Sequence, residues 1–118
     1  MKKIHTPSDT PDEWVMIHIE ATSTYKIFGS WFGGYLEADK WKLNSGIKTV
    51  EEGEDYYYFY GFSGSCYRCH KGNYATGTNY TSGVLDDLIE KSGAIFIGKD
   101  SVSDVISKIN QSQEDESK

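Results

Sequence analysis

The chain has 118 residues with two prolines and two cysteines, a length that fits one domain with a modest hydrophobic core of its own. Its net charge of −6 argues against nucleic-acid binding, because proteins that hold the phosphate backbone carry a clustered excess of Lys and Arg. No run of apolar residues reaches the length of a membrane span, so we expect no membrane partner and a cytoplasmic location.

The first half of the chain has the pattern of an antiparallel sheet. Residues 1–13 contain both prolines and show no periodic apolar pattern, which predicts an irregular N-terminal arm. The basic start of this arm is not followed by the apolar segment that a signal peptide would have. Five to six strands joined by short turns then predict a meander between Trp14 and His70. The candidate strands are 14–21, 24–32, 35–43, 47–52, 56–60 and 66–70, with Gly33-Gly34 as a tight hairpin turn.

In the C-terminal part, apolar residues repeat with the helical period in two segments, and a short strand lies between them. Ser82 can cap a helix with an apolar stripe at 84, 85, 88 and 89, residues 94–97 form a short buried strand, and Ser101 can cap a second helix with its stripe at 102, 105, 106 and 109. The fold class predicted is therefore α+β: the meander followed by helix, strand and helix packed on one sheet face. One domain is expected over 14–110, with a disordered acidic tail over 111–118.

The stretch EDYYYFYGFSGSCYRCH, residues 54–70, is the most aromatic part of the chain. In a strand, side chains alternate between faces, so Tyr56, Tyr58 and Tyr60 share one face while Tyr57 and Phe59 share the other. Both faces of this central hairpin are therefore expected to be aromatic. Tyr-rich surfaces often serve recognition, although a sheet also simply favours tyrosine.

The same stretch contains C-x-x-C-H, formed by Cys66, Cys69 and His70, which is the attachment motif of c-type haem. Haem attachment takes place in an export compartment, which conflicts with the absent signal peptide. Zinc is the better alternative, with Cys66, Cys69 and His70 as ligands and His18 or His5 completing the tetrahedron. A strand would send the two thiols to opposite faces, so we favour reduced, half-buried cysteines and expect no cofactor.

The polar segment 71–81 is the longest expected loop, and loops of this length are often functional. It follows a local cluster of positive charge, and its tyrosines are expected to have no core to fill. We therefore predict a ligand or partner site at the loop and the adjacent hairpin end. Its candidate residues are Arg68, His70, Lys71, Tyr74 and Tyr80, and the second candidate surface is formed by Trp31, Tyr35 and Trp41.

The segments WKLNSGI, EDYYYFYGFSGSCYRCHKGNY and VLDDLIEK, within about residues 41–90, resemble small proteins of tailed bacteriophages of the host-takeover or anti-defence type. The resemblance implies a phage or prophage product in the cytoplasm of the host cell. Small acidic phage proteins of this kind commonly act by binding, so the resemblance also implies a host or defence protein as the partner.

The leading functional hypothesis is a non-enzymatic inhibitor that binds a host or defence protein through acidic charge and aromatic side chains. The first alternative is a binder of a nucleotide-like small molecule, in which Tyr or Trp stacks on the base and Arg68 and Lys71 hold phosphate. A zinc-binding module is the other alternative. No enzyme is expected, because the cysteines near His70 lack an evident orienting acid. Homo-oligomer formation is left open.

Overall fold

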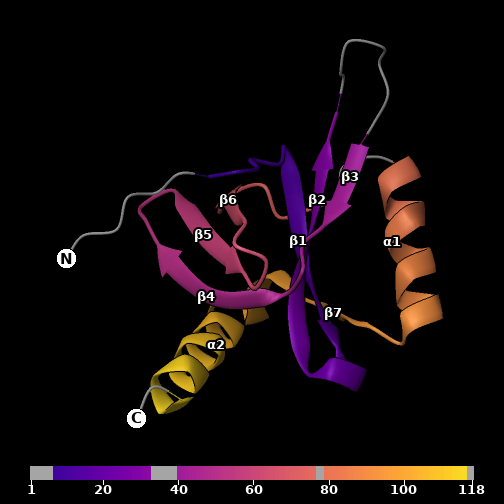
Figure 1. Cartoon of the computed structure of the whole chain (residues 1–118). Coiled ribbons are helices and arrows are strands. Elements are labelled where there is room, and N and C mark those ends of the chain that lie inside the picture. The colour runs from indigo at the N-terminus through magenta and orange to yellow at the C-terminus, as the bar shows by residue number, and fades with distance from the viewer. Residues whose placement is uncertain (1–6, 33–39, 77–78, 117–118) are drawn as a thin grey trace.

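The computed structural model describes residues 7–32, 40–76 and 79–116. It has the predicted α+β class, with antiparallel strands in a meander followed by two C-terminal helices (Figure 1). The strands are β1 (Glu13–Ile19), β2 (Thr24–Trp31), β3 (Lys40–Leu43), β4 (Ile47–Glu52), β5 (Tyr56–Gly61), β6 (Cys66–His70) and β7 (Ile95–Ile97). The helices are α1 (Asn79–Ser92) and α2 (Val102–Glu116), with short 3-10 turns η1 (Glu20–Thr22) and η2 (Lys99–Ser101).

The meander is divided into two sheets, with strand orders β3-β2-β1-β7 and β4-β5-β6. The division occurs after β3, where the backbone N–H of Asn44 donates to Ile27 O and the Asn44 Oδ1 accepts from Ile27 N–H. Gly46 follows with a φ of +128°, a conformation that glycine adopts without steric cost. These contacts end the first sheet and redirect the chain into the second.

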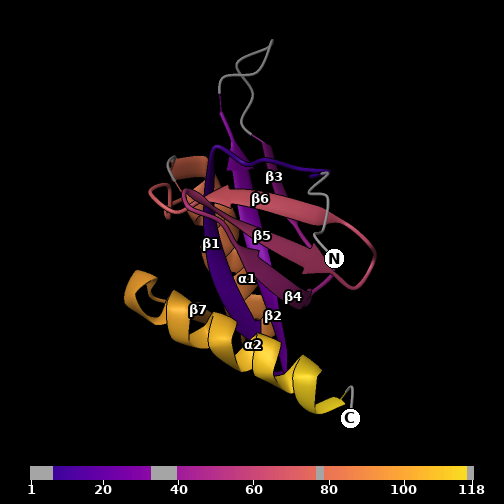
Figure 2. The ribbon, with the colours of Figure 1, turned by 90° about the vertical axis from the view of Figure 1, so that its left-hand side faces the viewer.

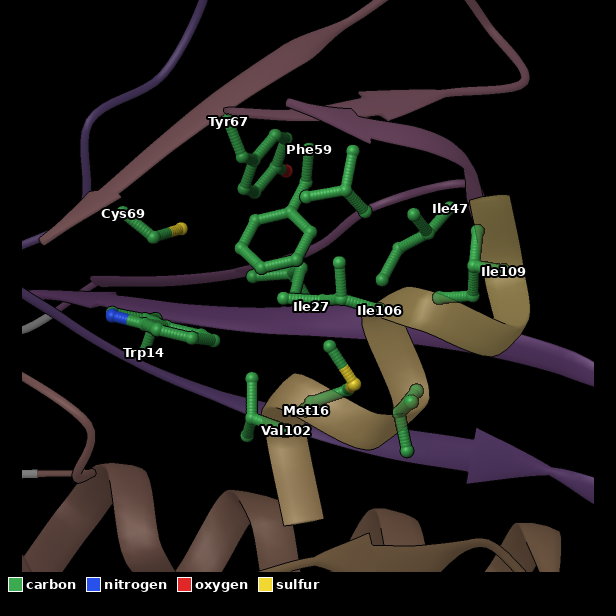
Figure 3. Close-up of a cluster of buried hydrophobic side chains, with 12 residues drawn as sticks. Trp14, Met16, Ile27, Ile47, Phe59, Tyr67, Cys69, Val102, Ile106 and Ile109 are labelled. Carbon is green, nitrogen blue, oxygen red and sulfur yellow. The ribbon is translucent and has the colours of Figure 1, made fainter. Parts of the chain in front are cut away.

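Two hydrophobic clusters fill the space on either side of the four-stranded sheet. Alternation along β1 sends Trp14 and Met16 into one cluster and Val15 and Ile17 into the other, which explains why this strand begins with a continuous apolar run. Figure 3 shows the larger cluster, where Phe59 lies among side chains from both sheets and from α2. The smaller cluster lies between the four-stranded sheet and α1.

The two helices lie on opposite sides of the four-stranded sheet rather than together on one face (Figure 1). Leu85 of α1 packs against Val15 and Phe28, whereas Val105 and Ile106 of α2 belong to the cluster shared with the second sheet. The reason is β7, which pairs antiparallel with β1 at the sheet edge and carries the chain from one face to the other. The apolar stripes of both helices were predicted correctly, but the stripe of α1 packs in the smaller cluster and that of α2 in the larger one.

The ends of the domain also differ from the sequence expectation. Helix α2 continues to Glu116, so residues 111–116 are helical and do not form a disordered tail. Residues 1–6 of the predicted N-terminal arm lie outside the described residues. Residues 8 and 9 dock along β6: Ser8 N–H donates to Cys66 O at 2.9 Å and Arg68 N–H donates to Asp9 O at 2.9 Å. The Gly33-Gly34 turn and the first part of the third strand lie outside the described residues.

Within the ranges that the structure describes, no helix combines the length and the apolar character needed to cross a membrane.

Candidate functional site

The predicted site residues are distributed over several parts of the fold. Arg68 and His70 lie on β6, Lys71 and Tyr74 lie in the connection between β6 and α1, and Tyr80 is an exposed residue of α1. Trp31 ends β2 and Trp41 lies in β3, while Tyr35 lies outside the described residues. The predicted site residues therefore come from β6, from the connection that follows it and from α1.

The outward face of the three-stranded sheet brings Arg68 and His70 together with tyrosines of β5. The antiparallel register pairs Tyr56 with His70 and Tyr58 with Arg68, so these side chains share one face. The Arg68 guanidinium lies 5.0 Å from the centroid of the Tyr56 ring, and the His70 ring meets Tyr56 edge-on at 5.1 Å. We call the surface formed by Tyr56, Tyr58, Tyr60, Arg68 and His70 the aromatic–arginine face.

The aromatic–arginine face is turned away from the hydrophobic core. Phe59, Tyr67 and Cys69 on the opposite face of these strands are buried in the large cluster. Figure 2 looks toward the three-stranded sheet, and no described helix or strand crosses in front of it. Arg68 Nε is a buried atom to which the described residues offer no hydrogen-bond acceptor. The side chains of the aromatic–arginine face are half-buried, so parts of the tyrosine rings and of the Arg68 side chain are accessible to a partner.

Lys71 lines a small cavity of about 240 Å³ beside the aromatic side chains of Trp14, Tyr57 and Tyr74. The Lys71 ammonium donates to the Glu52 carboxylate at 2.6 Å and lies 5.0 Å from the centroid of the Tyr57 ring. The hydrogen bond to Glu52 raises the pKa of Lys71. Because this ammonium forms an ion pair with the Glu52 carboxylate, its positive charge is partly neutralised, and Lys71 is less available to an anionic ligand than the sequence suggested.

Tyr74 is a structural residue. Its hydroxyl accepts from Met16 N–H at 2.9 Å and donates to Ile97 O, so it connects β1 to β7. Its ring packs edge-on against Trp14 with centroids 4.7 Å apart, and burial raises its pKa to about 12. The premise that tyrosines of this segment have no core to fill is wrong for Tyr74.

The two cysteines form no disulfide bond, and both are buried. Cys66 pairs with Tyr60 and Cys69 pairs with Tyr57, so β6 sends the two thiols to opposite faces. Burial, and secondly the nearby Cys66, raises the pKa of the Cys69 thiol well above its usual value. Among the described residues, which exclude His5, no group of three His, Cys, Asp or Glu side chains is placed to hold a metal ion.

The second candidate surface does not exist as one surface. Trp31 packs against the large cluster and its Nε1 donates to Thr10 O at 3.0 Å. Trp41 instead stacks on Phe28, a residue of the small cluster, with ring centroids 5.6 Å apart. The two tryptophans therefore lie on opposite faces of the four-stranded sheet.

Tyr56, Tyr58 and Tyr60 are not among the residues predicted for the site, although strand alternation places them on one face. Nothing local distinguished that face from the other, since both carry aromatic residues. Searches with the chain find no matching family model, no matching curated protein and no matching solved structure. The function therefore has to be argued from the chemistry of these surfaces.

Proposed function

We propose that the chain is a non-enzymatic binding protein that recognises a partner protein through the aromatic–arginine face. The observation that supports this proposal is the grouping of tyrosine rings around Arg68 on the outward face of a sheet whose inward face is packed. Tyr and Arg are the residue types that most often dominate the free energy of protein–protein binding.

The setting of these side chains favours tight recognition. They project from paired strands, so little backbone freedom is lost when a partner binds. The Tyr56 ring lies against both the Arg68 guanidinium and the His70 ring, which restricts the rotamers of all three side chains. A carboxylate or carbonyl group of the partner can accept hydrogen bonds from Arg68 while its apolar atoms pack on the tyrosine rings.

The resemblance to small phage proteins gives this proposal its biological setting. In that setting the partner is a host or defence protein whose active surface is covered by the aromatic–arginine face. The remaining acidic charge of the chain, net −6, contributes long-range steering toward a partner with basic groups around the contact.

The non-enzymatic part of the proposal is supported by the state of the thiols. Cys66 and Cys69 were the nucleophile candidates of the sequence, and both are buried. Since the thiolate is the reactive form, the raised pKa of Cys69 lowers its reactivity further.

The test begins with capture of the partner from a bacterial lysate by the immobilised chain and by a Tyr58→Ala, Arg68→Ala double variant. The wild type should retain a protein that the double variant loses. The captured protein is then purified and titrated by calorimetry, where each single truncation should cost about 1 to 4 kcal/mol of binding free energy.

A matched control is Tyr80→Ala, because Tyr80 is an equally large side chain, 57% exposed, on α1. This variant should bind the partner like the wild type. Circular dichroism must show that all variants are folded. Equal affinity of the wild type and the folded double variant would contradict the proposal.

A further inference from the structure

A further cavity of the described residues shares no lining residue with the aromatic–arginine face. It has a volume of about 450 Å³ and is bounded by the end of β1, the start of β2, β4 and α2. At this end of the molecule the row of inward side chains on β1, Trp14 and Met16, continues as His18, which is only half-buried.

Flat rings and apolar side chains form the base and one wall of the cavity. Ile47 and Ile109 belong to the buried core and close the bottom. His18 and Tyr25 are paired across β1 and β2, and their rings lie 4.4 Å apart with an angle of 33° between the planes. A flat ring of a ligand can stack against such a wall.

Phe62 also lines the cavity, and 60% of its surface is exposed. Its backbone N–H donates to Gly46 O at 3.1 Å, which ties the β5–β6 turn to the turn before β4. A Cβ on Gly46 would lie 2.6 Å from Thr24 Cγ2 and 3.2 Å from the Phe62 ring, so only glycine allows these groups to approach. Phe62 is therefore held in a defined position although it fills no core.

Positive charge and hydroxyl groups line the rest of the cavity. Lys48 of β4 and Lys108 of α2 contribute ammonium groups, and Thr22, Ser23 and Thr24 contribute hydroxyls. None of the described lining residues is acidic, although the chain has 18 Asp and Glu against 12 Lys and Arg. The local charge of the cavity is therefore opposite to that of the whole chain, which favours an anionic ligand.

We propose that this cavity binds a phosphorylated small molecule with a flat ring, of the size of a mononucleotide. The ring packs between Phe62 and the His18–Tyr25 pair, and the phosphate accepts hydrogen bonds from Lys48 and Lys108. A volume of about 450 Å³ falls within the range of small-molecule sites, about 300 to 1,000 Å³. The site is independent of the aromatic–arginine face, so neither proposal rests on the other.

The test is a titration of the isotope-labelled chain, followed by ¹H–¹⁵N NMR, with AMP, GMP, CMP and UMP. Adenosine and inorganic phosphate serve as separate arms that contain only the ring or only the anion. At least one nucleoside monophosphate should cause saturable shifts of the amides of residues 22–25, 48, 62 and 108. Both partial probes should bind at least about tenfold more weakly, because each lacks one of the two sets of contacts.

A Lys48→Gln, Lys108→Gln double variant should weaken binding of that nucleotide by at least about tenfold and reduce its salt dependence. Phe62→Leu should weaken binding of the nucleotide and of adenosine while leaving phosphate binding unchanged. The matched control is Lys91→Gln, since Lys91 is an exposed lysine of α1 paired with Asp87. It should bind like the wild type.

The proposal is overturned if none of the four nucleotides gives saturable shifts at millimolar concentration. It is also overturned if the shifts map to other residues, or if the folded double variant binds as tightly as the Lys91→Gln control.

Discussion

The two faces of β5 carry the same kinds of side chain and differ in what they do. Phe59 is fully buried and contacts the Trp14 ring, with centroids 5.3 Å apart. Tyr56 and Tyr58, its neighbours on the other face, are half-buried and lie beside Arg68. The position of a second layer of structure, rather than residue type, decides which aromatic stabilises the fold and which remains available for recognition.

The largest expected effect is on the inward face. Replacing Phe59 with Ala should lower the free energy of unfolding by about 3 to 5 kcal/mol, because it removes a fully buried ring and leaves a cavity between two sheets. Urea denaturation followed by circular dichroism measures this change. A loss below about 1 kcal/mol would show that the inward face is not a packed core.

Alkaline pH should destabilise the fold through tyrosines whose pKa is raised by burial, which include Tyr67 and Tyr74 on the inward side and Tyr60 on the outward face. Burial raises the pKa of Tyr67 and of Tyr74 to about 12, above the value of 10.0 of an exposed tyrosine. The unfolded chain therefore loses these protons first. The contribution of these two tyrosines to stability is complete below pH 10 and is lost as the pH rises toward 12, by up to about 1.4 kcal/mol per pH unit for each tyrosine.

Urea denaturation at a series of pH values between 9 and 11 tests this slope, with tyrosinate absorbance recorded in parallel. The Tyr74→Phe variant should show a shallower slope than the wild type, because it lacks the Tyr74 contribution while those of Tyr60 and Tyr67 remain. An identical slope in both proteins would contradict the assignment of Tyr74.

Tyr74→Phe at neutral pH tests the same residue as a hydrogen-bonding group. The variant should lose about 1 to 3 kcal/mol of stability, because Met16 N–H and Ile97 O lose the hydroxyl that connects them. Tyr80→Phe, on the exposed part of α1, is the control, and its stability in the same thermal melt should equal that of the wild type. If both variants were neutral, the connection between β1 and β7 would not depend on Tyr74.

The smallest effect on stability is expected on the outward face. Tyr58→Ala should change the free energy of unfolding by about 1 kcal/mol or less, which is the range of strand propensities. The same substitution should weaken partner binding as described above. A loss of stability as large as that of Phe59→Ala would mean that both faces of the sheet are core.

Much of the secondary structure could be predicted because its signals are local. The strands β4, β5 and β6 begin at the predicted residues, since short turns separate runs with clear alternation. The apolar stripes of both helices were also correct, because a period of about 3.6 residues marks one face of a helix wherever that face is buried. The end of α2 was missed, since polar acidic residues continue a helix without an apolar signal.

The candidate site was predicted less well. Arg68 and His70 were predicted because they are basic residues in an acidic chain, and the strand register places them on one face. Lys71 proved to be paired with Glu52, a residue 19 positions earlier in the chain. Such a pairing depends on how β4 and β6 lie relative to β5, which no local pattern encodes.

The alternation of the aromatic run determined by itself which tyrosines share a face, because the period of a strand is a property of the backbone. Only the packing of the two sheets decided that Phe59 is buried between them while Tyr58 lies on the outward side. Tertiary structure likewise turned Tyr74 inward, where it bonds to β1 and β7. Burial depends on contacts between residues distant in sequence, and in this chain those contacts separate core residues from candidates for recognition.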